Sequence, residues 1–160
     1  MKEKFDLEEL VADIVNEHSR ILKKSNKNIN LTYIFRDDIS GKAIVEADRS
    51  RVSQVVTNLI SNATKFTQEG NVIVTMKIRD DENAIVVRVK DTGEGINSEI
   101  LPRLFTKFAS SSFTGTGLGL YISKSILGEH GGRMWADNNV DGKGASFYFT
   151  LPLKKITVTQ

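Results

Sequence analysis

The stretch DRSRVSQVVTNLISNATKFT, residues 48–67, carries the most informative pattern in the chain. With about 100° of rotation per residue, it divides into an apolar arc and an opposite polar arc of one helix. The apolar arc consists of Val52, Val55, Val56, Leu59, Ile60 and Ala63. The polar arc consists of Gln54, Asn58, Asn62 and Lys65. The spacing therefore predicts a helix from about Asp48 to Phe66, with two asparagines one turn apart and a lysine beside them.

The polar arc of this helix has two interpretations. Most polar helix faces are simply solvated, but such faces usually carry glutamate and lysine rather than asparagine, which is a mediocre helix former. Neutral amide oxygens can instead ligate a hard cation, and a nearby ammonium group can hold phosphate. Asn58, Asn62 and Lys65 are therefore candidate ligands for a metal ion and a phosphate group.

A second motif, Asp91-Thr92-Gly93-Glu94-Gly95-Ile96, comes directly after a predicted strand. Glycines at alternate positions let the backbone turn sharply and approach a ligand closely. A carboxylate at the strand end can accept a hydrogen bond from the exocyclic amine of adenine, whereas guanine presents an acceptor at that position. The alternative interpretation is an ordinary Asp-Thr-Gly turn, which is common.

A third motif, Gly115-Thr116-Gly117-Leu118-Gly119-Leu120, joins a loop rich in serine, threonine and glycine to a predicted helix. The free N–H groups at a helix N-terminus attract anions such as phosphate. The motif is not a dinucleotide-binding fingerprint, because a loop rather than a strand precedes it. It is not a P-loop either, because no Gly-Lys-Ser/Thr follows.

The rest of the chain predicts an α+β fold, a two-layer sandwich in which helices pack on one face of a mixed, mostly antiparallel sheet. Further helices are expected at about 7–24 (with Asp6 as N-cap), 98–105 and 117–129. Strands are expected at 28–35, 43–47, 71–79, 84–90, 133–137 and 145–153, with turns at 37–42 and 80–83 and a loop at 106–116. No linker composition divides the chain, so we expect one domain over residues 1–153 and a tail over 154–160.

Composition excludes several classes of protein. The 160 residues include no cysteine, which rules out a disulfide scaffold, a zinc ribbon and a thiol nucleophile. The 22 Lys+Arg and 20 Asp+Glu give a net charge of +2, and the basic residues are scattered, so no nucleic-acid surface is expected. No apolar run could span a bilayer, and the N-terminus lacks the apolar stretch of a signal peptide. We therefore expect a cytoplasmic domain that makes no membrane contact.

Taken in order, the motifs resemble the catalytic, ATP-binding domain of sensor histidine kinases, which belongs to the superfamily of gyrase, Hsp90, histidine kinase and MutL. The ordered set is the asparagine helix, Asp-x-Gly-x-Gly at 91–95, Phe-x-x-Phe at 105–108 and Gly-x-Gly-x-Gly at 115–119. The resemblance covers the chain from Phe5 to Leu153, and residues 48–67 are similar to the family's N box. It implies a Bergerat-type ATP-binding fold with ATP and Mg²⁺ as cofactors.

The resemblance also implies a role for each motif residue. Asn58 would ligate Mg²⁺, Asn62 would support the metal or the phosphates, and Lys65 would contact phosphate, so that Asn58 and Lys65 serve catalysis. Asp91 would bind the adenine amine, and Thr92 would help through a water molecule. Phe66 would lie against the adenine ring, although a core phenylalanine is the alternative because Phe66 falls on the apolar arc. The remaining implied nucleotide contacts are Gly93, Gly95, Ile96, Phe105, Phe108, Gly115, Thr116, Gly117, Leu118 and Gly119, with residues 106–116 as the ATP lid.

Two positions depart from the family pattern. Gln54 stands where the hydrolytic relatives carry a glutamate that activates water, and an amide cannot act as a general base. This difference favours phosphoryl transfer over hydrolysis. Ala109-Ser110 follow Phe108, where many sensor kinases carry an arginine that stabilises the transferring phosphate, and Lys107 could take over that role.

The resemblance implies a partner that this sequence does not contain, namely a dimerisation domain whose histidine accepts the phosphoryl group. Neither His18 nor His130 lies in a phosphoacceptor context. A response regulator would be reached indirectly, the isolated domain is expected to be monomeric, and the domain could be the cytoplasmic part of a membrane-bound sensor. Two alternatives remain open: an ATP-hydrolysing machine of the gyrase or Hsp90 type, and a non-catalytic module that recognises a protein when nucleotide binds.

Overall fold

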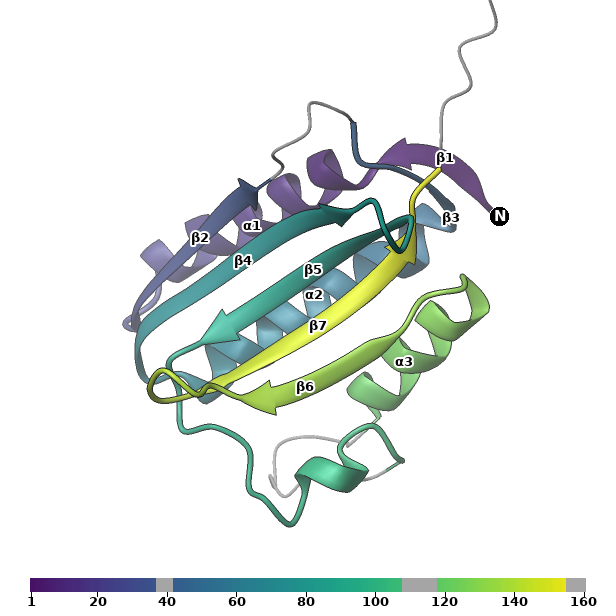
Figure 1. Ribbon diagram of the computed structural model, residues 1–160. Helices are drawn as coiled ribbons and strands as arrows, with labels where there is room; N and C mark the ends of the chain where they lie inside the picture. The colour runs from purple at the N-terminus through teal and green to yellow at the C-terminus, as the bar shows by residue number, and fades with distance from the viewer. Residues whose placement is uncertain (37–41, 108–117, 155–160) are drawn as a thin grey trace, which may run out of the picture.

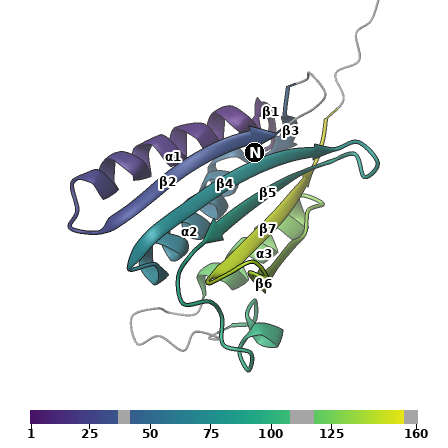
Figure 2. The same ribbon diagram turned by 60° about the vertical axis from the view of Figure 1, so that its left-hand side comes forward.

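A five-stranded sheet and the helices on one of its faces form two layers (Figures 1 and 2). The computed structural model describes residues 1–36, 42–107 and 118–154. The strand order is β2-β4-β5-β7-β6, in which β2 and β4 are parallel and the other neighbours are antiparallel. The strands are β2 (Asn28–Arg36), β4 (Glu69–Arg79), β5 (Ala84–Asp91), β6 (Met134–Asn138) and β7 (Ala145–Pro152). The predicted α+β sandwich with a mixed, mostly antiparallel sheet is confirmed.

The helices of this layer are α1 (Leu7–Lys23), α2 (Arg49–Phe66) and α3 (Gly119–Glu129). The predicted cap of α1 is confirmed, because the Asp6 carboxylate accepts the Glu8 N–H at 2.9 Å. Asp48 caps α2 in the same way, accepting the Arg51 N–H at 3.3 Å. The whole predicted apolar arc of α2 is buried in the core between the helices and the sheet. The strands contribute Val74, Met76, Val87 and Phe149 to the same core. Burial of this arc turns the amide arc of α2 away from the core.

A second, two-stranded sheet was not predicted as such. It consists of β1 (Glu3–Asp6) and β3 (Ile44–Ala47), which pair antiparallel beside the start of α1. The sequence indicated β3 but not β1, because a four-residue strand with only Phe5 buried has too short a pattern to read. Together the two strands cover the end of the helix layer where α1 and α2 begin.

The predicted helix at 98–105 is wrong in extent. The structure forms a single 3-10 turn, η1 (Leu101–Arg103), with a proline in it. Helix α3 begins at Gly119, two residues later than predicted. Within the described residues no helix is both long and apolar enough to cross a membrane.

The N-terminus of α2, well before Asn58 and Asn62, is joined to the C-terminus of α3. His130, at the C-terminus of α3, accepts the Asp48 N–H on Nε2 at 3.1 Å and lies 2.7 Å from the Ile126 carbonyl through Nδ1. The neutral imidazole with its proton on Nδ1 satisfies both contacts. An exposed ion pair, Arg51 to Glu129 at 2.8 Å, lies beside them. The start of α2 is therefore fixed to the end of α3.

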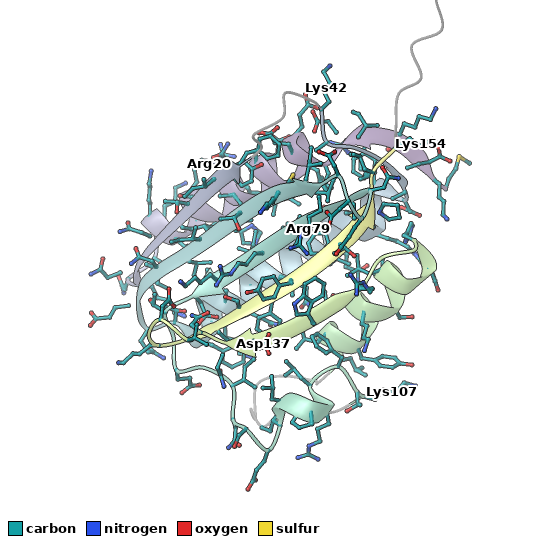
Figure 3. All side chains as sticks on the ribbon, in the orientation of Figure 1. Arg20, Lys42, Arg79, Lys107, Asp137 and Lys154 are labelled. Atoms are coloured by element: carbon teal, nitrogen blue, oxygen red, sulfur yellow. The ribbon has the colours of Figure 1, made fainter. Side chains whose placement is uncertain are left out.

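Among the described residues, no helix covers the other face of the sheet, which faces the viewer in Figure 3. Long side chains cover it instead. The rings of Trp135 and Tyr148 stack with centroids 5.2 Å apart. Arg133 lies 5.6 Å from the Trp135 ring, and Arg88 lies 5.4 Å from the Tyr148 ring. This cation and aromatic stack shields strands that lack a second layer.

Candidate functional site

The outward arc of α2 brings together the predicted amides, as the helical spacing indicated. Asn58 and Asn62 are partly buried, and Lys65 is exposed near the C-terminus of the helix. Asn58 Nδ2 donates a hydrogen bond to Ser123 Oγ of α3 at 3.1 Å. Its other amide atom, Oδ1, accepts no hydrogen bond from the described residues. An oxygen of the type that binds hard cations is thus held in place without a donor from the described residues.

The first turn of α3 lies directly on the Asn58 amide. A Cβ added at Gly119 would lie 2.7 Å from Asn58 Oδ1, so a side chain at this position would displace the Asn58 amide. Gly119 is therefore required here for close approach between the two helices rather than for backbone freedom. Of the predicted glycine-rich motif, Leu118 and Gly119 are described and both are partly buried. Gly115, Thr116 and Gly117 lie outside the described residues, as does Phe108.

Asp91 ends strand β5 in a buried position, with 4 % of its surface exposed. Its Oδ1 accepts two backbone N–H groups, from Gly93 at 2.9 Å and from Ala145 at 3.2 Å. No described residue donates to Oδ2. Burial raises the pKa of the Asp91 carboxyl, and the two N–H donors oppose that rise by stabilising the charged form. The carboxylate is thus fixed through one oxygen and presents the other.

The turn after Asp91 packs against the C-terminus of α2. A Cβ added at Gly93 would lie 2.4 Å from the Phe66 carbonyl oxygen and 3.1 Å from Thr67 Oγ1, so only glycine fits. Asn58 and Phe66 are eight residues apart on one helix, a separation of about 12 Å along its axis. Helix α2 therefore connects the amide cluster at one end of the site with the carboxylate turn at the other.

Thr67 was not identified from the sequence, although it lies at the centre of this junction. The residue is fully buried, and its hydroxyl has no hydrogen-bond partner among the described residues. An unpaired buried hydroxyl costs about 1–3 kcal/mol. A polar ligand or a water molecule bound beside Gly93 would remove that cost, so the site fits a ligand with hydrogen-bonding edges.

Two asparagines at the end of β6 were also missed, and they brace the same turn. Asn138 makes two hydrogen bonds to the Ile96 backbone, accepting its N–H at 2.7 Å and donating to its carbonyl at 2.9 Å. Asn139 donates to the Asp91 carbonyl at 2.8 Å. These contacts span more than forty residues of sequence, so no local pattern could have indicated them. They fix the predicted site residues Gly95 and Ile96 relative to Asp91.

The structure shows what four residues with predicted roles contact. The Thr92 hydroxyl bonds the Asn71 backbone, accepting its N–H at 3.0 Å, and so ties the turn to β4. The alternative that Phe66 is a core residue is wrong, because 41 % of its surface is exposed and Lys65 Nζ lies 5.3 Å from its ring. Phe105 packs partly buried against the core. Lys107, the proposed substitute for an arginine, lies 5.1 Å from the Tyr121 ring.

The residues present can accommodate a magnesium nucleotide. Asp91 supplies an acceptor for a planar amine, Gly93 and Gly119 leave room where a Cβ would intrude, and the Asn58 oxygen receives no donor from the described part of the chain. The described residues include no cluster of three or more histidine, cysteine, aspartate or glutamate side chains. A metal ion here would thus depend on amide oxygens and on the phosphates of its ligand.

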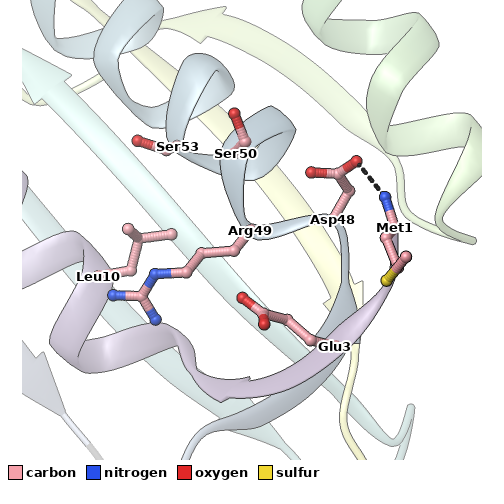
Figure 4. A pocket seen from close by; sticks show the side chains of 7 residues that line it. All are labelled: Met1, Glu3, Leu10, Asp48, Arg49, Ser50 and Ser53. Carbon is pink, nitrogen blue, oxygen red and sulfur yellow. Dashed lines mark hydrogen bonds and ion pairs between the residues drawn. The ribbon is translucent and has the colours of Figure 1, made fainter.

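A separate pocket lies at the N-terminus of α2 (Figure 4). Its lining residues are Met1, Glu3, Leu10, Asp48, Arg49, Ser50 and Ser53. The Asp48 carboxylate caps the helix there and pairs with the terminal ammonium of Met1 at 2.9 Å. The helix terminus is therefore already neutralised by the protein itself.

Comparisons with known proteins bear on this geometry. Residues 47–155 match the family described as histidine kinase-, DNA gyrase B-, and HSP90-like ATPase. The sensor protein FixL of Bradyrhizobium diazoefficiens is 44 % identical over 115 residues, which cover 70 % of this chain and 22 % of FixL. The nucleotide-free catalytic domain of the histidine kinase ThkA has a TM-score of 0.81 at 32 % identity, with 96 % of each chain covered.

Two further solved assemblies are similar to this chain. Full-length ShkA in complex with AMPPNP has a TM-score of 0.82 at 26 % identity, covering 98 % of this chain and 32 % of that one. ThkA in complex with the response regulator protein TrrA has a TM-score of 0.76 at 31 % identity, covering 96 % of this chain and 42 % of that one. The chain thus spans the whole catalytic domain of ThkA but less than a quarter of FixL.

Proposed function

The chain belongs to the family of histidine kinase-, DNA gyrase B- and HSP90-like ATPases and has the fold of a sensor histidine kinase catalytic domain; from this premise we propose that it binds Mg²⁺-ATP and transfers the γ-phosphoryl group to a histidine on a separate dimerisation domain. In this reaction the bond from the γ-phosphorus to the bridging oxygen breaks, a bond to an imidazole nitrogen forms, and ADP leaves. The full sensor, its signal and its response regulator lie outside this chain.

The proposal rests on the different hydrogen bonding of the two carboxylate oxygens of Asp91. Its Oδ1 is saturated by two backbone N–H groups, while Oδ2 receives no donor from the described residues. A carboxylate oxygen held at the floor of a site accepts the exocyclic amine of adenine and repels the carbonyl of guanine. Asp91 thus selects the base, with Thr67, Gly93, Gly95 and Ile96 around it and Phe66 beside the ring.

The amide arc of α2 serves the phosphate end of the same ligand. Asn58, supported by Asn62, offers amide oxygens to Mg²⁺, and Lys65 offers an ammonium to the phosphates. The bound metal ion would neutralise charge on the phosphates and orient them for in-line transfer. Leu118, Gly119 and the glycine-rich segment before them would contribute backbone N–H groups at the start of α3.

Phosphoryl transfer is favoured over hydrolysis by the position of Gln54. This residue is exposed one turn before Asn58 on α2, and its neutral amide cannot remove a proton from water. Both histidines of the chain are engaged in the protein: His130 in the contacts to Asp48 and Ile126, and His18 at 3.0 Å from the Ile14 carbonyl through Nδ1. These contacts support an acceptor histidine on a separate dimerisation domain. Because ATP is the substrate, the proposal places this domain in the cytoplasm.

Two measurements test the proposal. The first is calorimetry of AMPPNP binding with Mg²⁺ and with EDTA, for the wild type, Asn58→Ala and the control Gln54→Ala. We expect Mg²⁺ to strengthen binding in the wild type and the control but not in Asn58→Ala. Equal affinities for ATP and GTP in the wild type would contradict the role of Asp91.

The second measurement mixes the chain with a separately prepared dimerisation domain and labelled ATP. Acid-labile phosphohistidine on the partner is the expected product. Tight ATP binding without phosphohistidine would favour the non-catalytic module instead. Steady release of phosphate by the isolated chain would favour a hydrolytic machine.

A further inference from the structure

The hydroxyl of Ser123 is the only described partner of the Asn58 amide, and it comes from a different helix. Asn58 Nδ2 donates to Ser123 Oγ at 3.1 Å, across 65 residues of sequence. We propose that Ser123 is a positioning residue that fixes the rotamer of the Asn58 amide, so that Oδ1 rather than Nδ2 is offered to the metal ion. This inference rests on the proposed function, because it assumes that Asn58 is the metal ligand.

The local geometry makes Ser123 suited to that role. Ser123 follows Gly119 by four residues, so the two lie on the same face of α3, one turn apart. Ser123 is buried, with 2 % of its surface exposed, so its hydroxyl has little competition from water. Gly119 approaches the amide so closely that an added Cβ would meet both Oδ1 and Nδ2, at 2.7 and 3.1 Å. One turn of α3 thus contacts both terminal atoms of the Asn58 amide and holds Nδ2 through the Ser123 hydroxyl.

The chemical consequence follows from the symmetry of an amide. Rotation by 180° exchanges the oxygen and the nitrogen of an asparagine with almost no change in shape, and only hydrogen bonds distinguish the two states. A serine hydroxyl in a helix can donate to a carbonyl of the preceding turn and keep its lone pairs as acceptors. In the structure Ser123 Oγ accepts from Asn58 Nδ2, which corresponds to the state in which Nδ2 faces Ser123. The metal-binding oxygen then lies on the side of the amide nearest Gly119, at the start of α3.

Asn62 provides an internal comparison. It lies one turn from Asn58 on the same arc of α2, yet its side-chain amide makes no hydrogen bond within the described residues. The two asparagines therefore differ in how firmly their amides are held. We expect the Asn58 amide to be ordered before nucleotide binds and the Asn62 amide to rotate freely.

The test compares Ser123→Ala with the matched control Ser125→Ala, an exposed serine two residues further along α3. AMPPNP binding is measured by calorimetry with Mg²⁺ and with EDTA. We expect Ser123→Ala to lose about three- to tenfold of the Mg²⁺-dependent gain in affinity, which corresponds to one neutral hydrogen bond. Binding in EDTA should stay within about twofold of wild type, as should both values for Ser125→Ala.

A second readout needs no nucleotide. In ¹⁵N-labelled wild-type protein, the Asn58 side-chain NH₂ resonances, assigned from their loss in Asn58→Ala, should exchange with solvent more slowly than those of Asn62. Ser123→Ala should shift the Asn58 resonances and abolish the difference. Equal exchange of the two amides in the wild type would overturn the proposal, even if Ser123→Ala failed to fold.

The two variants distinguish the metal role of Asn58 from the positioning role of Ser123. If Asn58→Ala loses the Mg²⁺-dependent gain and Ser123→Ala keeps it in full, the metal role of Asn58 stands and the positioning role of Ser123 is refuted. If Asn58→Ala keeps the gain, the metal role itself is wrong and the positioning role falls with it.

Discussion

Replacing Asp91 by asparagine should make the nucleotide-free protein more stable and a weaker ATP binder. The substitution keeps the shape of the side chain and one carbonyl oxygen. That oxygen can still accept the N–H groups of Gly93 and Ala145, which now bond Oδ1 at 2.9 and 3.2 Å. What is removed is a negative charge held in a buried position. Stability is therefore expected to rise because no hydrogen bond is lost with the charge.

The pH dependence of this gain has a defined sign. Burial raises the pKa of Asp91 in the folded protein above its unfolded value of about 4. The folded state then binds more protons than the unfolded state between those two values. The Asp91 contribution to the free energy of unfolding consequently falls as pH rises through that window. The stability advantage of Asp91→Asn should be small in acid, grow through the window, and level off above it.

The magnitude of the binding defect follows from the free oxygen of Asp91. With Oδ1 occupied by its two donors, the asparagine must present its NH₂ group where Oδ2 was. Loss of a hydrogen bond to a charged acceptor costs about 1.5–3 kcal/mol, or about 10- to 150-fold in affinity for ATP. The presented NH₂ group matches the carbonyl of guanine, so the preference for ATP over GTP should shrink further.

Thermal denaturation between about pH 4 and 8, together with calorimetry of ATP and GTP binding, measures both effects. The natural control is Asp137→Asn, an exposed carboxylate on β6, for which neither quantity should change. A lower melting temperature for Asp91→Asn at neutral pH would refute the burial argument. An unchanged affinity for ATP would refute the assignment of Oδ2 to the base.

Three further substitutions probe the frame around the site. Gly93→Ala places a Cβ 2.4 Å from the Phe66 carbonyl, so it should cost about 1–3 kcal/mol of stability, measured by urea denaturation, and weaken ATP binding; a neutral effect would show that the turn can move away from α2. His130→Ala leaves the Asp48 N–H without its acceptor, so it should cost about 1–3 kcal/mol of stability. The melting temperature should fall by about 2–4 °C for each kcal/mol lost, while Mg²⁺ should still strengthen nucleotide binding. A melting curve like that of the wild type would mean that water replaces the imidazole. Arg51→Ala breaks an ion pair whose side chains are 52 and 59 % exposed, so it should change stability by less than about 1 kcal/mol, and a larger loss in the same assay would reveal a network beyond that pair.

The part of the site that lies on α2 could be predicted because it depends on local periodicity. Once the apolar arc is buried, Asn58, Asn62 and Lys65 must face outward together. The same reasoning failed at Phe66, because a helical wheel gives the direction of a side chain but not what lies in that direction. Phe66 is the last residue of α2, and 41 % of its surface is exposed there.

The contacts that complete the site could not be predicted, because they join residues far apart in the sequence. Ser123 meets Asn58 across 65 residues, and Asn138 meets Ile96 across 42. Serine and asparagine are common in loops and on helix surfaces, so their residue types alone carry no signal. The small sheet of β1 and β3 was missed for the same reason, since its pairing depends on register rather than on pattern.

The two attachments between α2 and α3 have a mechanical consequence. Ser123 joins the middle of α3 to the middle of α2, and His130 joins the end of α3 to the start of α2. We expect the two contacts together to oppose sliding of α3 along α2.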